Sequence, residues 1–400
     1  MTKDVVIVSA LRTAIGDFGG ALAGISPCDL AAEVSRAAIA RAGLTGADIG
    51  QAVFGNVIHT APEDMYLSRV AALRAGVPET APALTLNRLC GSGLQAVITA
   101  SEQIKLGYTD IALAGGAENM SRAGHLLTQA RTGQKMGDVR AIDMMVGALT
   151  DPFGNGHMGV TAENIATRNR IDRATQDAFA AESHHRAARA IAEGRFTDQI
   201  HPITVKRGRS EGVFDQDEHV RPDVTAADLA KLRAAFAKDG TVTAGNASGL
   251  NDGAAALVLM DAATAVAKDI APLARIVASG LGGVAPDVMG MGPVPAVRQA
   301  LARAGLTAAD MAVIESNEAF AAQACAVSAE LGFDADRTNP NGGAVALGHP
   351  IGASGAIILV KLIHELRRIG GRYGLATMCI GGGQGIAVII ENPAAKSVST

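Results

Sequence analysis

A repeated ten-residue segment is the feature that most constrains how this chain of 400 residues can fold. The segment ARAGLTGADI at 40–49 recurs as ARAGLTAADM at 302–311, an offset of 262 residues (302 − 40). The same offset places Gly91-Ser92-Gly93 on Ala353-Ser354-Gly355 and the segment 110–117 on 372–379. A register kept over so many residues predicts two halves with one topology.

The register changes beyond residue 117. GLNDGAAALVLM at 249–260 resembles GGGQGIAVIIE at 381–391, where the offset is only 132 residues (381 − 249), so the first half carries an insertion of about 130 residues. We expect an N-terminal half formed by 1–117 with 249–271, an inserted domain at 118–248 and a C-terminal half at 272–400. The longest helical tract of the insertion is expected at 161–194.

Each half alternates strand-like apolar runs with amphipathic helical runs. The first half reads DVVIVSA, DLAAEVSRAAIARAG, QAVFGNV, a helix after Cys90, DIALAGG and a closing hairpin. This order predicts α/β layers with a mixed sheet in each half. Two halves packed as pseudo-twofold mates would bring equivalent loops together. The apolar run at 373–390 is interrupted by CIGGGQG, which favours two buried strands around a turn over a transmembrane helix.

The composition argues against several classes of function. Hydrophobic residues make up 48% of the chain, charged residues 18%, and the formal net charge is −4. This is neither the composition of a disordered chain nor the basic excess of a nucleic-acid-binding protein. We therefore expect no nucleic-acid partner and no membrane association.

The four cysteines are widely spaced and form no CxxC motif, which favours a reducing, cytoplasmic location. His184 and His185 are adjacent on a predicted helix and point in different directions, so we predict no metal site.

Cys90, in NRLCGSGLQA, lies where a strand ends and a helix begins. Unpaired N–H groups and the positive end of the helix dipole should favour its thiolate, as in a nucleophile. A buried structural thiol and a redox thiol are alternatives. A third alternative is a dinucleotide-binding loop, since Gly91-x-Gly93-x-x-Ala96 matches G-x-G-x-x-A. A lone cysteine does not decide between these interpretations.

Three residues of the second half are candidates to act with Cys90. The repeat places the loop that carries His349 opposite Cys90, which makes His349 a candidate base. Cys379 precedes IGGGQG at another strand end, and two thiols near one histidine suggest either a disulfide couple or one nucleophile and one proton carrier. Asn317 lies at a strand-to-helix junction, where its amide could cap the helix or hold a water or an oxyanion.

Four blocks, in this order, resemble the signature segments of the thiolases: NRLCGSGLQA (87–96), NEAFAAQA (317–324), GHPIGASG (348–355) and CIGGGQG (379–385). HMGVTAEN (157–164) and GTVTAGNASGLNDGAAA (240–256) are similar to further segments of that family. The resemblance covers essentially the whole chain and is closest to bacterial biosynthetic β-ketothiolases and acetyl-CoA acetyltransferases. It implies the α/β thiolase fold, with two βαβαβαββ halves packed as αβαβα layers and an inserted loop domain.

The resemblance also implies a reaction. Cys90, activated by His349, would attack an acyl thioester, with the N–H groups of Cys90 and Gly381 as the oxyanion hole. Cys379 would then remove an α-proton from acetyl-CoA, and His349 with a water held by Asn317 would stabilise the enolate. The product would be a 3-oxoacyl-CoA, and thiolysis is the reverse reaction.

For binding, the resemblance implies coenzyme A as substrate and product, with no permanently bound cofactor. Arg221 would lie against the adenine, and Asp228 stands where some relatives have a serine near it. Met289 near the acyl pocket suggests that the substrates have short linear acyl chains.

Segment 121–138 resembles the tetramerisation loop of the family, which implies a homotetramer built as a dimer of dimers. The implied substrate contacts are Leu149, His157, Met158, Arg221, Phe236, Ala244, Ser248, Met289, Ala319 and Phe320.

Other functions share parts of this pattern. A decarboxylating ketosynthase has a nucleophilic cysteine but no need of Cys379 as a base. A cysteine acyl-CoA hydrolase would use the same Cys–His pair with water as acceptor, and an acyl-CoA carrier would bind without becoming acylated. The pathway also stays open, because polyhydroxyalkanoate synthesis and fatty-acid breakdown both use this chemistry.

Overall fold

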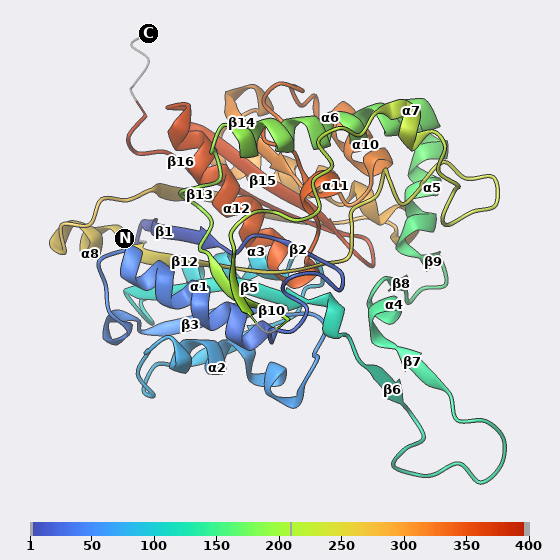
Figure 1. Cartoon of the computed structure of the whole chain (residues 1–400). Coiled ribbons are helices and arrows are strands. Elements are labelled where there is room, and N and C mark those ends of the chain that lie inside the picture. Colours follow the sequence, from blue (N-terminus) through green and yellow to red (C-terminus); the bar gives the residue numbers. More distant parts are fainter. Residues whose placement is uncertain (1–2, 209, 396–400) are drawn as a thin grey trace.

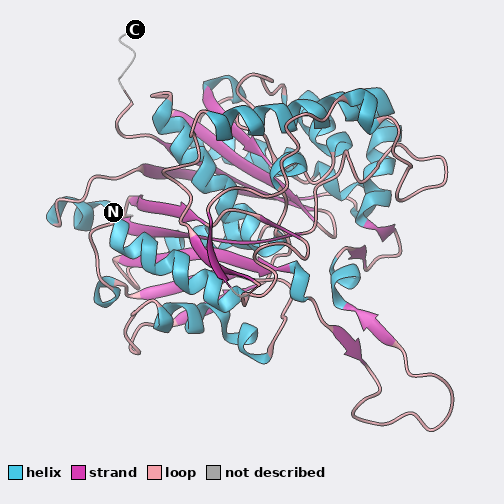
Figure 2. Cartoon of the chain, viewed as in Figure 1, coloured by secondary structure: helices cyan, strands magenta, loops and turns pink. Residues whose placement is uncertain are grey.

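One continuous sheet runs through both halves of the computed structural model, which describes residues 3–208 and 210–395 (Figures 1 and 2). Ten strands of the described chain form it, in the order β14-β15-β16-β13-β1-β12-β5-β3-β4, with β2 paired to β12. The first-half order β1-β12-β5-β3 repeats in the second half as β13-β16-β15-β14. This is the duplication that the 262-residue offset predicts.

The first half contains the elements expected from the sequence. Its central helix begins two residues after Cys90, as predicted. The half comprises β1 (Val5–Arg12), β2 (Gly16–Asp17), α1 (Pro27–Arg41), β3 (Gln51–Gly55), α2 (Leu67–Arg74), β4 (Ala83–Leu86), α3 (Ser92–Lys105), β5 (Ile111–Asn119), β12 (Asn251–Asp261) and α8 (Ala262–Ala267).

The second half repeats this plan without the insertion. The apolar run at 373–390 forms two buried strands around a turn, as expected. No helix within the described ranges is long and apolar enough to cross a membrane. The half comprises β13 (Ala274–Gly283), α9 (Pro293–Ala304), β14 (Met311–Ser316), α10 (Ala321–Leu331), α11 (Ala344–Leu347), α12 (Ile351–Arg368), β15 (Tyr373–Ile380) and β16 (Gln384–Glu391).

The segment between β5 and β12 is mostly helical with short hairpins. The tract expected as one helix at 161–194 is two helices, because Arg170 adopts a left-handed conformation (φ 55°) that ends the first one. The segment comprises β6 (His125–Leu127), β7 (Ala141–Asp143), α4 (Met144–Ala148), β8 (Thr150–Asp151), β9 (Gly156–His157), α5 (Met158–Asn169), α6 (Arg173–Ala192), β10 (Ile203–Arg207), β11 (Ser210–Phe214) and α7 (Ala226–Leu229).

Helices α3 and α12 lie between the two parts of the sheet and join the halves (Figure 1). They approach closely because each helix has a glycine at the contact. A methyl group on Gly93 would lie 2.7 Å from the Ala356 nitrogen, and one on Gly355 would lie 2.4 Å from the Leu94 nitrogen. Gly93 and Gly355 are related by the 262-residue offset. The repeat thus supplies the small residue that each helix needs at the contact.

Beside this helix pair, the buried carboxylate of Glu118 holds the halves together. It accepts hydrogen bonds from the backbone N–H groups of Val57 and Ile58 in the first half and of Gly352 at the start of α12. Burial raises its pKa to about 8, against the opposing effect of these donors. The loops that carry Cys90 and His349 are therefore fixed relative to each other.

Candidate active site

A cavity of about 490 Å³ has walls from both halves and from the insertion. Cys90, His349, Cys379 and Gly381 all line it, so the structure brings together four of the five residues assigned to chemistry from the sequence. Its walls also include an apolar cluster in which Cys379 packs with residues such as Met158, Met289 and Phe320. An apolar, partly enclosed cavity strengthens charge interactions with any substrate bound in it.

Cys90 sits in a constrained turn between β4 and α3. The preceding Leu89 has φ 47°, and the Ser92 hydroxyl ties the turn by donating to the Leu89 carbonyl (2.6 Å) and accepting from the Arg88 N–H (2.8 Å). Helix α3 begins at Ser92, so Cys90 precedes its first turn. The turn presents the thiol to the cavity.

The expectation that Cys90 rests as a thiolate is wrong. Burial raises the pKa of the thiol to about 11, and the N–H groups of Gly381 and Cys90 oppose this rise without overcoming it. Cys90 at rest is therefore a neutral thiol, which would have to lose its proton before or during attack on a thioester. The two N–H groups remain available near the sulfur for a developing negative charge.

The imidazole ring of His349 is held in place by Ser354. Its Nδ1 lies 2.6 Å from the Ser354 Oγ, and Ser354 Oγ donates to the Pro350 carbonyl (2.9 Å). Because the serine proton is used there, Ser354 accepts from Nδ1–H, which assigns the imidazole proton to Nδ1. The buried Nε2 has no hydrogen-bond partner among the described residues. Burial lowers the His349 pKa to about 4, so Nε2 carries a free lone pair at neutral pH.

Cys379 is the next-to-last residue of β15, close to the glycine turn 381–383 that leads into β16. It is buried, and burial raises the pKa of its thiol above the usual range, with a smaller rise from the negative charge that Cys90 carries once it is ionised. Gly382 and Gly383 have φ of 81° and 88°, which explains the glycine run. A second, less acidic thiol therefore stands beside the first.

Asn317 is not the helix cap that one interpretation predicted. Helix α10 begins at Ala321 after Phe320, and Asn317 lies four residues before it, where its N–H donates to the Thr377 carbonyl (3.0 Å). Its Nδ2 is buried and has no partner among the described residues. Asn317 does not line the 490 Å³ cavity and instead lines a smaller one behind His349. An unpartnered amide donor is available to a water or an oxygen.

All ten residues that the sequence implicated in substrate contact line the large cavity: Leu149, His157, Met158, Arg221, Phe236, Ala244, Ser248, Met289, Ala319 and Phe320. The rings of His157 and Phe236 stack at 4.7 Å. Burial lowers the His157 pKa. Asp228 instead bonds Thr225 and Lys231 on the surface of α7, which holds its pKa at about 2.

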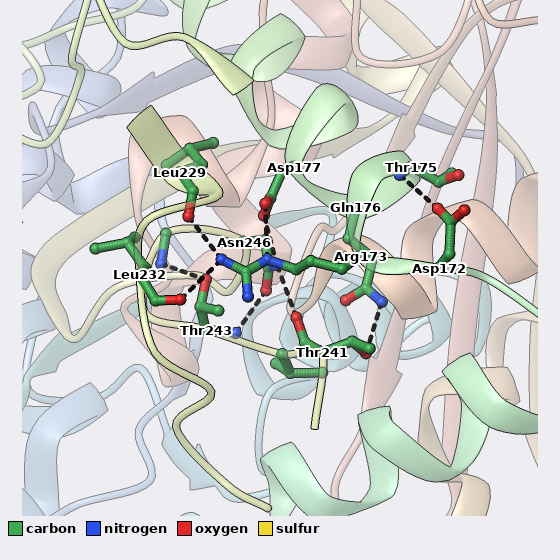
Figure 3. Close-up of polar contacts among 12 residues, drawn as sticks. Asp172, Arg173, Thr175, Gln176, Asp177, Leu229, Leu232, Thr241, Thr243 and Asn246 are labelled. Carbon is green, nitrogen blue, oxygen red and sulfur yellow. Dashed lines mark hydrogen bonds and ion pairs between the residues drawn. The ribbon is translucent and has the colours of Figure 1, made fainter. Parts of the chain in front are cut away.

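A polar network around Asn246 (Figure 3) fixes the loop that also carries Ala244 and Ser248. Asp177 on α6 accepts from Arg173 (2.7 Å) and from the Asn246 amide (2.9 Å). The Asn246 carbonyl in turn accepts from the Ala321 N–H (2.8 Å), and the Ser248 N–H donates to the Ala319 carbonyl (3.0 Å). The insertion and the second half are thus joined along one wall of the cavity.

Four residues near the site were given no role in the sequence analysis. Ser354 holds His349, and its repeat mate Ser92 holds the Cys90 turn, so the 262-residue offset contained the signal. His219 lines the cavity and pairs with Asp17 (2.5 Å), and no sequence pattern pointed to it. Asn251 connects the same region to the site, because it contacts Asp17 and accepts from the His349 N–H (2.9 Å).

The dinucleotide-binding alternative does not fit. Helix α12 covers Gly93, with the Ala353 carbonyl 3.0 Å from the position of an added methyl group. A pyrophosphate could not reach this turn.

A cluster of side chains that could bind a metal ion, Cys28 with Glu63 and Asp64, lies away from the cavity. The Asp64 oxygens already accept hydrogen bonds from Cys28, Thr60 and Ala61.

Comparison with protein families gives two matches that together cover most of the chain. Residues 5–263 match the model described as "Thiolase, N-terminal domain", and residues 270–392 match "Thiolase, C-terminal domain". The boundary between them falls between β12 and β13, where the second half of the repeat begins.

Individual relatives agree with these matches. The chain is 59% identical to beta-ketothiolase BktB of Cupriavidus necator over 98% of this chain and all of that protein. It is 50% identical to an acetyl-CoA acetyltransferase of Chromobacterium violaceum with the same coverage. Among solved structures, human mitochondrial 3-ketoacyl-CoA thiolase in complex with CoA has a TM-score of 0.95 at 43% identity, with 98% of each chain covered.

Proposed function

This chain belongs to the thiolase family and is an acyltransferase that condenses acyl-CoA molecules, and we propose that it does so through an acyl-Cys90 intermediate, with short linear acyl groups preferred. The observation that carries this proposal is the unpartnered Nε2 of His349 in the cavity that also contains both thiols. CoA is substrate and product. A base with a free lone pair, a thiol to receive the acyl group and a second thiol are the groups that this condensation needs.

In the first half-reaction, Cys90 Sγ attacks the thioester carbon and its proton moves to His349 Nε2. The oxyanion is held by the N–H groups of Cys90 and Gly381, which already oppose the effect of burial on the Cys90 pKa. The carbon–sulfur bond to CoA then breaks, and the departing CoA thiolate takes the proton of Cys379. This leaves acyl-Cys90, protonated His349 and a Cys379 thiolate.

In the second half-reaction, the Cys379 thiolate removes an α-proton from acetyl-CoA. Protonated His349 and a water held by the Asn317 amide donate to the enolate oxygen, which lowers the cost of the carbanion. The enolate carbon attacks acyl-Cys90, the 3-oxoacyl-CoA forms, and the Cys90 sulfur recovers its proton from His349. Each group returns to its starting state, so the cycle is balanced.

We assign the inserted segment to CoA binding. His157 and Phe236 offer a stacked pair of rings in the cavity, and Arg221 has no ion-pair partner among the described residues. Arg221 can therefore stack on adenine as a cation–π partner. The Asp228 carboxylate is engaged by Thr225 and Lys231, and we assign it no CoA contact.

The experiment that tests the proposal is CoA-dependent cleavage of acetoacetyl-CoA beside longer 3-oxoacyl-CoA substrates, with mass spectrometry of the protein after exposure to acetyl-CoA. We expect rapid cleavage of acetoacetyl-CoA and an acetyl group on the peptide that contains Cys90. Cys90→Ala should abolish both, whereas Cys379→Ala should keep the acetyl group and lose cleavage. Acetyl-CoA hydrolysis without cleavage would favour a cysteine hydrolase instead.

We also propose a homotetramer, built as a dimer of dimers, in a reducing cytoplasm where the four free cysteines stay reduced. The β6–β7 arm extends from the body (Figure 1), and its exposed side chains include Leu126, Met136 and Ile142. Apolar groups on a projecting arm favour contact with other subunits.

Removing the arm tests this assembly. Replacing residues 125–143 by a short glycine-serine linker should convert tetramers to dimers, measured as mass by light scattering. Leu106→Ser, which alters an exposed apolar residue outside the arm, is the control and should leave the tetramer intact. A wild-type protein of monomer mass would contradict the proposal.

A further inference from the structure

A buried ion pair lies behind the catalytic histidine and outside the substrate cavity. Lys361 Nζ is 2.7 Å from Glu315 Oε2 and also donates to the Gly342 carbonyl at 2.7 Å. The Lys361 and Glu315 side chains are only 3% and 1% exposed. The reaction steps described above use neither side chain.

The pair connects three segments that carry active-site residues. Glu315 lies in β14, two residues before Asn317, and Gly342 begins the segment that leads to His349. Lys361 lies on α12, seven residues after Ser354, so the two side chains share one face of the helix. One ammonium group thus holds the Asn317 segment and the His349 segment to the helix whose serine orients His349.

Stability alone is a weak reason for such a pair. Desolvation of two charges offsets much of their attraction, and apolar replacements of similar volume are often neutral or stabilising. Burial raises the pKa of Glu315 to about 7 in spite of Lys361, with the nearby carboxylates of Glu318 and Glu365 adding to the rise. Holding the pair here therefore costs free energy, which a role in positioning would explain.

A small cavity of about 20 Å³ adjoins the pair. Its polar lining comes from Glu315, Ser316, Asn317, Ser354 and Lys361. Glu315 Oε1 and Ser316 Oγ are buried without a hydrogen-bond partner in the described part of the chain. A polar cavity needs roughly 10–15 Å³ to hold a water, and a buried water makes about three hydrogen bonds. The volume and these groups suit one water.

We propose that Lys361, Glu315 and one water in this cavity form a buried brace that positions Asn317 and His349 for the enolate step. The inference rests on the proposed function of those two residues. Lys361 and Glu315 are positioning residues, because they touch the catalytic segments and not the substrate. The brace acts mainly on the second half-reaction, since Ser354 holds His349 in the first half-reaction without it.

The test separates the two half-reactions in Lys361→Met, which removes the ammonium group and keeps much of the side-chain bulk. Exchange of acetyl groups between acetyl-CoA and labelled CoA reports acylation of Cys90. Exchange of the α-protons of acetyl-CoA with deuterated water reports enolate formation. We expect the second rate to fall about 100-fold, as for a misplaced catalytic group, and the first by less than about tenfold. The KM for acetyl-CoA should be unchanged.

Arg275→Met is the matched control. It removes a positively charged side chain from an ion pair with Glu391 where β13 pairs with β16. Glu391 keeps Arg372 as a partner. The control should leave the ratio of the two exchange rates unchanged. If Lys361→Met lowers the melting temperature and reduces both rates equally, the pair is structural only and the proposal is overturned. Wild-type protein without either exchange would refute the proposed function instead.

A second variant covers the case in which Lys361→Met does not fold. Glu315→Leu with Lys361→Met leaves no unpaired buried charge and should fold with stability close to wild type. It should still lose α-proton exchange, since the Gly342 carbonyl has lost its donor. Full exchange in this double variant would overturn the brace, and a wild-type crystal structure with no water beside Glu315 would remove the water from it.

Discussion

Cys90 and His349 line the same cavity as a neutral thiol and a neutral imidazole. Burial acts on both in opposite directions, raising the thiol pKa to about 11 and lowering the imidazole pKa to about 4. In the proposed mechanism, attack by Cys90 is therefore coupled to proton transfer, and the pair does not need to rest as an ion pair. The absence of a resting thiolate also protects Cys90 from adventitious oxidation.

This pairing predicts the pH dependence of acylation. His349 has to be unprotonated to accept the proton, so the rate should fall as the pH drops toward 4 and stay level between about pH 6 and 9. Single-turnover transfer from acetyl-CoA, followed by quenching and mass spectrometry, measures this rate. A rise with a midpoint near 8.5, typical of an exposed cysteine, would show that a free thiolate attacks instead.

Ser354 should matter to chemistry more than to folding. Ser354→Ala leaves His349 Nδ1 without its acceptor, so the imidazole can adopt the tautomer whose Nε2 is protonated. We expect kcat for acetoacetyl-CoA cleavage to fall by roughly 100-fold with little change in KM. Ser35→Ala removes a buried hydroxyl on α1 that has no hydrogen-bond partner within the described ranges, and it serves as the control. Equal losses in the two variants would contradict the role of Ser354.

Met289 should limit the length of the acyl chain. It is buried and lines the cavity in one cluster with Phe320 and Cys379, so Met289→Ala would enlarge the apolar space beside Cys379. The ratio of kcat/KM for 3-oxohexanoyl-CoA to that for acetoacetyl-CoA should rise roughly tenfold. Met291→Ala is a fair control, because Met291 packs against a different cluster. An unchanged ratio would show that the chain length is limited elsewhere.

Among the elements, the close contact of α3 with α12 aligns the loops that carry Cys90 and His349. Gly93→Ala would force a methyl group to 2.7 Å from a backbone nitrogen that cannot move alone. We expect a loss of about 1–3 kcal/mol in the free energy of unfolding, measured by urea denaturation. Gly24→Ala has open space around it and should cost far less. A Gly93→Ala protein as stable as wild type would mean that the helices can separate.

At the level of elements, the sequence predicted existence and type better than boundaries. Alternating apolar runs identified β1, β3, β5 and the paired strands β15 and β16, because buried strands and amphipathic helices leave strong periodicities. The split at Arg170 was missed, since a left-handed residue other than glycine has a weak sequence signal. The interpretation of Asn317 as a helix cap was also wrong. Helix α10 begins at Ala321, and Phe320 rather than Asn317 occupies the N-cap position.

The pairing of the loops that carry Cys90 and His349 was predictable for a different reason. The 262-residue offset alone relates the Cys90 loop to the His349 loop, so two segments far apart in the sequence could be paired. The resting charge of Cys90 could not be predicted, since it depends on burial by side chains from both halves and the insertion. His219 and the Lys361–Glu315 pair escaped notice because nothing local in the sequence marks a contact between distant segments.

On the scale of the whole molecule, the two halves share little sheet pairing of their own. Strands β1 and β13 meet over two residue pairs, Val6 with Arg275 and Ile7 with Ala274. Helices α3 and α12 and the side chain of Glu118 make most of the contacts between the halves. They lie close to the loops that carry Cys90 and His349. The same contacts that hold the duplicated fold together therefore set the geometry of the site.

The insertion enters the fold where the second half has a three-residue glycine turn. Its flanking residues Asn119 and Asp252 are direct partners across β5 and β12, so the two ends of about 130 residues emerge side by side. A segment with adjacent ends can be exchanged without stretching the strands that hold it. Chimeric proteins that combine the inserted segment of one relative with the two halves of another should therefore fold. Ligand preference could then change between relatives while the two halves keep the same bond-forming chemistry.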